Sequence, residues 1–320
     1  MAQISHSSAR MTAWVHACAV AVLVGLILLP AAPAAGQPLR IIRPEDYQRN
    51  TVPKEPDNRA APVELPERRV DISDDKTVLV KSLLGIRLVP LPKDIEKDPT
   101  TTGIEIKNIP LIDNPEFRQV LQPYLGKPVT MRSISLMIRD AVAYYQGKDR
   151  PVVDVFVPEQ EITKGVVQLL VVEAHVGQIK VTGLKFFSDD LIRSYIALKP
   201  GDVIRASKLL ADMDYINNNP FRFVRPVLQP GKEFGTTDVI ADARDRMPVR
   251  FYGGYEDTGS RSTGLEREFV GFNAGNFLGL GHEVGYQYTT NRHVADFGIH
   301  SAYWRVPLPN RDTLSFFGNW

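Results

Sequence analysis

The hydrophobic pattern of this 320-residue chain changes at Pro248. Beyond that residue, large apolar or aromatic side chains alternate with polar residues or glycine, first in residues 249–256 and again in residues 283–288. Residues 249–320 hold 11 of the 23 glycines and 14 of the 28 Phe, Tyr and Trp residues. Such alternation, in segments of about ten residues divided by turns, is typical of strands with lipid on one side and water on the other.

We therefore predict antiparallel transmembrane β-barrel strands over residues 248–320. In a later segment the alternation assigns Ala295, Phe297 and Ile299 to the apolar face. The 72 residues from Val249 to Trp320 hold about four or five strands, whereas the smallest known barrels need about eight, so the barrel is expected to be incomplete in this sequence. A soluble β-sandwich also has alternating strands. The density of aromatic residues and the export signal described next favour the membrane.

Residues 1–36 have the three parts of a secretory signal peptide: a basic start ending at Arg10, an apolar stretch, and small residues before Gly36. The apolar stretch has about 16 residues, fewer than the roughly 20 that a spanning helix needs. Cleavage near Gly36 would remove Cys18, the only cysteine, which fits an oxidising compartment. Residues 37–75 are rich in Pro, Arg and Glu, and we expect a disordered, locally extended tether there.

The region between the tether and Pro248 contains one pattern twice: strand, helix, helix, strand, strand. The first copy lies within residues 76–174. Its predicted elements are a strand over 78–89, a helix capped by Asn114, a helix from Thr130 to Gly147, and strands over 152–157 and 166–172.

The second copy lies within residues 175–247. Its predicted elements are a strand over 179–186, a helix capped by Ser188, a helix carrying Leu209 and Ile216, and strands over 221–228 and 237–243. Each copy has one helical layer and one sheet, which is enough for a small two-layer α+β domain.

Several short motifs of the chain resemble those of one family. In the first copy they are the pair Tyr144 and Tyr145, the turn at 155–162, Gly165 and the ending 171–173. Their order and spacing are similar to the first POTRA domain of two-partner secretion outer-membrane translocators (TpsB), the ShlB, FhaC and HecB family of hemolysin secretion and activation proteins. Ala174 and His175 stand where that family usually has glycine.

The rest of the chain extends this resemblance. Residues 219–222 and 228–239 are similar to segments of the family's second POTRA domain, and residues 255–264 and 276–282 to its first barrel strands and turns. The resemblance implies an outer-membrane protein whose periplasmic POTRA domains capture an unfolded exported protein, which a β-barrel then conducts outward without nucleotide hydrolysis. The implied partners are a TpsA-like exoprotein and outer-membrane lipid, and a monomer is expected.

The resemblance also implies a client-binding site, because such domains add an extended chain to a sheet edge. The first candidates lie on the strand that begins at residue 152 and on the helix facing it. They are Val152, Val153, Asp154, Val155, Phe156, Ile138, Val142 and Tyr145. For the three helix residues, an ordinary place in the core is the competing interpretation.

Other functions find less support. A formal net charge of +1 gives no attraction to nucleic acid. Residues 257–260 spell an aspartic protease triplet, but it occurs once, whereas that chemistry needs two carboxylates. Gly279 and Gly281 precede a predicted strand, so no helix N-terminus is available to hold a phosphate. His282, His293 and His300 lack the short spacing of metal ligands.

We therefore expect no enzyme activity, no cofactor and no metal. A BamA-like outer-membrane protein assembly factor and a soluble periplasmic binding or scaffold module remain as alternatives.

Overall fold

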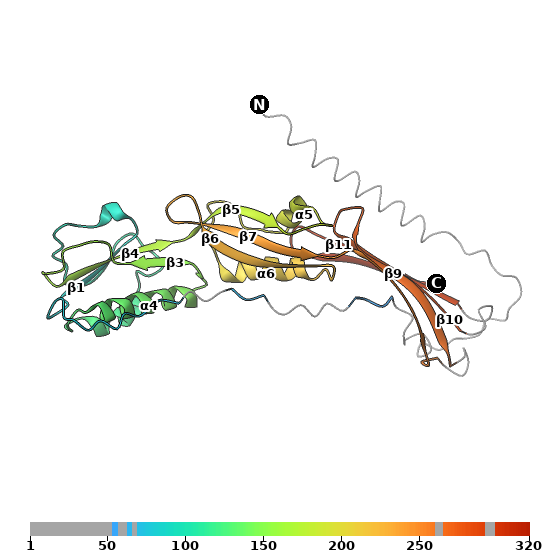
Figure 1. Cartoon of the computed structure of the whole chain (residues 1–320), viewed down its shortest axis with the longest axis horizontal. Helices are drawn as coiled ribbons and strands as arrows, with labels where there is room; N and C mark the ends of the chain where they lie inside the picture. The colour runs from blue at the N-terminus through green and yellow to red at the C-terminus, as the bar shows by residue number, and fades with distance from the viewer. Residues whose placement is uncertain (1–52, 57–62, 66–68, 260–264, 292–297) are drawn as a thin grey trace, which may run out of the picture.

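The computed structural model describes residues 53–56, 63–65, 69–259, 265–291 and 298–320. It is elongated, with two α+β domains in a row followed by a curved antiparallel sheet (Figure 1). The predicted signal peptide and most of the predicted tether lie outside the described residues.

The first domain has a four-stranded sheet in the order β2-β1-β4-β3. β1 pairs in parallel with β2 and β4, while β3 pairs with β4 in antiparallel fashion, so β3 is an edge strand. The elements are β1 (Gly85–Val89), a 3-10 turn (Pro92–Asp94), β2 (Gly103–Ile106), α3 (Pro115–Leu121), a second 3-10 turn (Gln122–Tyr124), α4 (Met131–Gly147), β3 (Val153–Phe156) and β4 (Val166–Glu173).

Local signals correctly placed the two helices of this domain. The Asn114 side chain accepts a hydrogen bond from the Phe117 N–H, which confirms the predicted cap. The second helix begins after Thr130, as predicted, and Thr130 forms a capping box with Ser133. The helices cover one face of the sheet with buried side chains. Among these are Phe117, Leu121, Met137, Ala141 and Tyr145.

The strand prediction for this domain was partly wrong. Strand β1 begins at Gly85, because residues 79–83 pair instead with the segment just before α4, through the Val80–Val129 bridge and the bond from the Leu83 N–H to the Lys127 carbonyl. The sequence prediction also missed β2. It has only four residues and lies in a proline-rich stretch, so it is too short to stand out as an alternating segment.

The second domain has a three-stranded sheet in the order β5-β7-β6, which makes β6 an edge strand. Its elements are β5 (His175–Thr182), α5 (Asp189–Ser194), α6 (Ala206–Asn217), β6 (Arg222–Pro230) and β7 (Thr236–Asp245). The Ser188 cap is confirmed. The first strand ends earlier than predicted, since Gly183 turns the chain with a φ of +88° and the Asp245 carboxylate accepts hydrogen bonds from the backbone of Lys185, Phe186 and Phe187.

The C-terminal part is a five-stranded meander in the order β12-β11-β10-β9-β8, with every neighbouring pair antiparallel. Its strands are β8 (Val249–Glu256), β9 (Arg267–Phe277), β10 (His282–Thr290), β11 (Gly298–Pro307) and β12 (Thr313–Asn319). Within the described residues, β8 and β12 form the two open edges. No helix in the described parts of the chain is both long enough and apolar enough to cross a membrane.

The register divides this sheet into two chemically different faces. Phe251, which is 80% exposed, shares one face with Val270, Phe272 and Tyr286. The opposite face is polar on most strands. It carries Arg250, Tyr252, Glu256, Arg267, Asn273, Glu283, Gln287, Ser301 and Arg305. This arrangement is the one that strands between lipid and water require.

One part of the predicted alternation was wrong. Ala295 and Phe297 lie outside the described residues, but Ile299 pairs with Thr289 and therefore belongs to the polar face. The apolar face of β11 instead carries Trp304, which pairs with Val284. Pairing with β10 decides which face each residue of β11 lies on, and a short alternating segment considered without its partner strand can be assigned one residue out of register.

Candidate functional site

The outer edge of β3 exposes main-chain groups that no neighbouring described strand uses. The Ala174 N–H donates to the Val152 carbonyl, so residues 152, 154 and 156 form the hydrogen-bonded pairs with β4. The N–H and C=O groups of Val153 and Val155 therefore point outward. Their side chains enter the core, while Phe156, 40% exposed, lies on the opposite face of the sheet.

The predicted helix residues do not line this edge equally. Val142 and Tyr145 are buried in the core, and Ile138 is half-buried against it. The Tyr145 hydroxyl donates to the Glu173 carboxylate at 3.1 Å, and burial raises the pKa of this tyrosine. Val152 lies between the two domains and packs against the core of the second. These positions give Val142 and Tyr145 a supporting place beneath β3.

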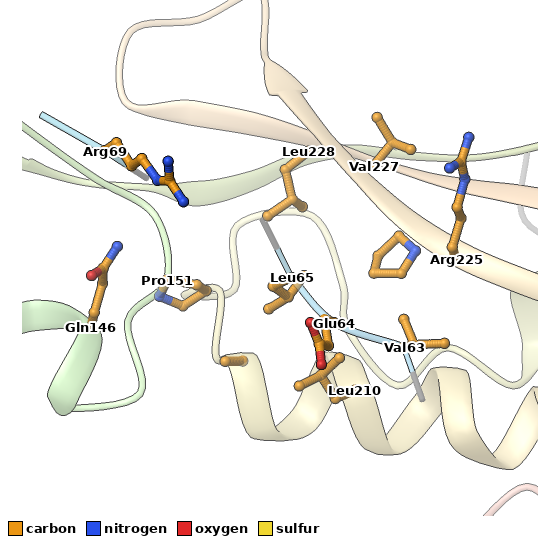
Figure 2. Close-up of a pocket in the computed structure, with 12 residues that line it drawn as sticks. Val63, Glu64, Leu65, Arg69, Gln146, Pro151, Leu210, Arg225, Val227 and Leu228 are labelled. Atoms are coloured by element: carbon orange, nitrogen blue, oxygen red, sulfur yellow. The ribbon is translucent and has the colours of Figure 1, made fainter. Parts of the chain in front are cut away.

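A groove of about 1140 Å³ lies between α6 and the edge strand β6 (Figure 2). Leu210 of α6 and Leu228 of β6 line it, and Gln146 and Pro151 of the first domain close one end. Pro226 interrupts the row of N–H groups along β6, which is tolerated at a sheet edge.

Residues 63–65 of the predicted tether form one wall of this groove. Val63 and Leu65 pack against the core of the second domain, while the intervening Glu64 is exposed (Figure 2). This contact was not predicted, because residues 63–65 had been assigned to the disordered tether. Two apolar residues separated by one polar residue, within a polar stretch, were the available signal.

The second domain is attached to the end of β9, next to the turn that leads to β10. The Asn219 amide donates to the Gly275 carbonyl at 2.7 Å, and the Asn276 amide donates to the Phe186 carbonyl at 2.9 Å. Beside these bonds, the buried Arg222 guanidinium lies 5.0 Å from the centre of the Phe187 ring and donates to the Ile216 carbonyl. Burial lowers the pKa of Arg222.

A second attachment joins α6 to the turn between β11 and β12. Arg311 binds the Asp212 carboxylate through both Nε (2.8 Å) and Nη2 (2.6 Å). The Tyr215 hydroxyl donates to the Leu308 carbonyl at 2.8 Å. The contacts at the end of β9 and at the turn between β11 and β12 together fix both the position and the rotation of the second domain relative to the sheet.

Residues 53–56 lie on the polar face of the C-terminal sheet. The Lys54 ammonium lies 2.5 Å from the Glu256 carboxylate, and the Lys54 backbone N–H donates to the Tyr252 hydroxyl. Glu55 pairs with Arg305. The chain therefore contacts this face before it reaches the α6–β6 groove.

Comparison with known families identifies the two α+β domains. Residues 100–174 match the model described as "POTRA domain, ShlB-type", and residues 174–246 match the POTRA model "Surface antigen variable number repeat". The chain therefore contains two POTRA domains, the first of which is of the ShlB type. The resemblance that the sequence motifs indicated is confirmed.

Curated relatives and a solved structure extend the likeness. The chain is 24% identical over 171 residues to the heme/hemopexin transporter protein HuxB of Haemophilus influenzae, covering 53% of this chain and 30% of HuxB. It is 20% identical over 198 residues to the outer membrane transporter CdiB-2 of Burkholderia pseudomallei, covering 59% of this chain and 33% of that protein. The structure of CdiB from Escherichia coli matches with a TM-score of 0.57 and 17% identity, over 78% of this chain and 43% of CdiB. The chain thus spans less than half the length of each.

With POTRA domains identified, the motif at residues 219–222 has a clear structural place. Asn219 and Arg222 lie at the joint between the second POTRA and the C-terminal sheet, far from the edge of β3. The Gly279 and Gly281 turn, with φ of +72° and +70°, closes the hairpin that this joint holds.

The motifs that we set aside have ordinary positions. His282 accepts a bond from the Trp304 indole, and His300 lies beside the Tyr286 hydroxyl. His293 and Ser260 lie outside the described residues. Among the described residues, no group of three or more His, Cys, Asp and Glu side chains could hold a metal ion.

Proposed function

We propose that the chain is part of an outer-membrane translocator that captures an unfolded exported protein with its periplasmic POTRA domains. The C-terminal strands lie in the outer membrane, and the client passes along their polar face without nucleotide hydrolysis. The ShlB-type POTRA domain supports this role, as does the similarity to HuxB and CdiB-2, which are transporters.

The observation that carries the proposal is the joint between the second POTRA and a sheet with one apolar and one polar face. Asn219 binds the end of β9, and Arg311 lies in the turn between β11 and β12, at the same end of that sheet. A polypeptide held by the POTRA domains therefore lies next to the end of the polar face. A soluble scaffold would gain nothing from exposing Phe251 and Val270 on the other face.

Capture begins at the edge of β3. An extended client adds as a further strand, and the outward N–H and C=O groups of Val153 and Val155 supply the main-chain hydrogen bonds. Client side chains on the exposed face contact Phe156. Because these hydrogen bonds involve main-chain groups, binding depends more on an extended client backbone than on the identity of the client's side chains. An unfolded client meets this requirement.

The α6–β6 groove provides a second contact of a different kind. Because Pro226 interrupts the donors of β6, recognition there depends on apolar side chains entering the groove. Residues 63–65 illustrate the ligand that fits: an extended segment with apolar side chains at alternate positions. Client segments with the same alternation are the expected occupants.

Replacement of Val153 by proline tests the edge. Proline removes an N–H that points away from β4, so the ladder with β4 stays intact while the client loses a donor. Val153→Ala is the matched control, because it removes core volume but keeps the N–H. We expect a synthetic client peptide to bind at least tenfold more weakly to Val153→Pro and nearly normally to Val153→Ala. Equal affinity of the two variants would exclude the edge as the site.

Cell fractionation tests the location. The native gene product is expected in the outer-membrane fraction, resistant to carbonate or high-salt extraction. Recovery of the folded protein in the soluble periplasm would contradict the translocator function and favour a soluble binding module.

A further inference from the structure

The N-terminus of helix α6 is capped by a residue from the other POTRA domain. Arg205, at the N-cap position, makes no side-chain cap. Instead Asp149, which follows α4 of the first domain, accepts hydrogen bonds from the Ser207 N–H at 2.7 Å and from the Ser207 hydroxyl at 2.6 Å. A carboxylate here also interacts favourably with the helix dipole.

The backbone at Asp149 departs from the usual local rule. The Arg150 N–H bonds to the Tyr145 carbonyl and the Asp149 N–H to the Gln146 carbonyl, which is the Schellman pattern that ends a helix. In this motif the residue at the position of Asp149 adopts a left-handed conformation and is usually glycine. Asp149 has a φ of +64°. An aspartate thus stands at a position where the backbone conformation favours glycine. The hydrogen bonds that its carboxylate accepts from Ser207 account for the presence of this side chain.

The carboxylate is charged at this joint. Burial acts to raise the pKa of Asp149, but the two bonds from Ser207 and the nearby Arg150 and Arg205 outweigh it, so that the pKa lies below its ordinary value. The cap is therefore at full strength at neutral pH.

The Asp149 cap lies between the two candidate client contacts. Pro151, two residues before β3, closes one end of the α6–β6 groove, and Val152 packs against the core of the second domain. Only these few residues separate the outward edge of β3 from the groove. The angle between the domains therefore decides whether one extended chain can contact both.

We infer that Asp149 is a positioning residue that fixes the two POTRA domains at the angle joining the β3 edge and the α6–β6 groove into one track for a single extended, alternately apolar polypeptide. This inference rests on the proposed client capture. It assigns no client contact to Asp149 itself, which acts through the placement of α6.

Three variants in the full chain separate this role from simple stability. Asp149→Gly removes the cap and also relieves the left-handed backbone, so α4 keeps its termination. Asp149→Asn retains an acceptor oxygen and tolerates the same backbone. Asn114→Ala is the matched control, because it removes a helix cap that lies entirely within the first domain.

The first measurement is the distance between spin labels on cysteines placed at the exposed Lys81 and Lys232, one in each domain, with Cys18 replaced by serine. We expect a narrow distribution for the wild type and Asn114→Ala, a width at least doubled in Asp149→Gly, and an intermediate width in Asp149→Asn. An unchanged distribution in Asp149→Gly overturns the inference.

The second measurement uses synthetic peptides with alternating apolar and polar residues, of about six and about twelve residues. At about 3.3 Å per residue, the shorter peptide covers one contact and the longer covers both. Linked contacts multiply in affinity only when geometry permits simultaneous binding. Asp149→Gly is expected to bind the long peptide about tenfold more weakly and the short peptide equally well. An equal loss for both peptides, or none for either, overturns the inference.

The two proposals fail differently. If neither peptide binds the wild type, the proposal of client capture at these contacts is wrong, and so is the proposal of a continuous track. The spin-label distances still decide whether Asp149 fixes the angle between the two domains. If both peptides bind the wild type and Asp149→Gly alike, client capture stands and the positioning role alone is wrong.

Discussion

Asp212 and Arg311 connect the second POTRA to the C-terminal sheet through an ion pair in which the carboxylate is fully buried and the guanidinium is one-third exposed. Asp212 also accepts a hydrogen bond from the Ala197 N–H, so the carboxylate belongs to the packing of its own domain. The pair joins a helix and a turn that are 99 residues apart in sequence. Such a contact links the position of the domain to the ionisation of one side chain.

We predict that Arg311→Ala destabilises the docked second POTRA by about 2 kcal/mol. Breaking a buried pair by removing one partner costs about 3–5 kcal/mol, and the partial exposure of Arg311 reduces that. Hydrogen exchange of α6 peptides in the full chain is the measurement. Arg311→Lys is the control and is expected to recover part of the protection. Identical exchange in Arg311→Ala and the wild type would contradict the prediction.

The same pair predicts a pH dependence. Burial, partly offset by Ala197 and Arg311, raises the pKa of Asp212. The folded state then binds the proton more tightly than the unfolded state, so this group favours folding at low pH and its contribution is lost as pH rises through the folded pKa. Without Arg311 the pKa rises further. We expect the stability of Arg311→Ala to fall more steeply than that of the wild type between acid and neutral pH, as measured by denaturant unfolding. A parallel pair of curves would refute this.

A methyl group added at Gly275 is expected to disturb the joint at β9. Its Cβ would overlap the Phe221 ring and lie 3.0 Å from Asn219 Oδ1. Overpacking of this kind costs about 2 kcal/mol. Gly318→Ala is the control, because this strand glycine has a negative φ and nothing within 4 Å of an added Cβ. Thermal unfolding in detergent should separate the two variants, and equal midpoints would show that the joint tolerates the methyl group.

The groove contact predicts that Leu65→Ser increases the binding of an alternately apolar peptide several-fold. Leu65 packs against the core of the second POTRA, so its loss weakens the hold of the chain's own segment and leaves apolar surface free. Glu64→Ser is the control, since Glu64 is exposed. Fluorescence titration of a labelled peptide measures the effect. Equal binding by both variants would show that residues 63–65 do not compete with the peptide for the groove.

The two faces of the sheet predict different responses to charge. Phe251→Arg places a cation on the apolar face and is expected to cost about 2 kcal/mol or more if the position lies near the bilayer centre. Asn319→Arg places the same cation on the opposite face, where it pairs with Ser301, and should be tolerated. The recovery of folded protein in outer-membrane fractions compares the two, and similar losses would contradict the assigned faces.

Features set by neighbours in sequence were predictable. Asn114, Thr130 and Ser188 each cap a helix within three residues, so their sequence context contains the whole interaction. Features set by distant partners were not. Ile299 was assigned to the wrong face because its register depends on β10. Strand β2 was missed because it has only four residues, and its pairing with the distant β1 is what defines it as a strand.

The candidate site shows the same division. The resemblance to the TpsB family implied the edge strand, and the structure places β3 at the edge. The burial of Val142 and Tyr145, the groove contact of Leu65, and the bonds from Ser207 to Asp149 all depend on which elements meet in space. Whether the edge binds a client stays a prediction.

The two contacts of the N-terminal segment limit how far the second POTRA can move from the C-terminal sheet. Residues 53–56 are held on the polar face of the sheet and residues 63–65 in the α6–β6 groove, with seven peptide links from Pro56 to Val63. A fully extended chain of that length reaches about 25 Å. The contacts of Asn219 and Arg311 hold the second POTRA against the sheet. If those contacts are lost, the covalent link still limits the separation, because one of the two contacts of the N-terminal segment must break once the link is fully extended.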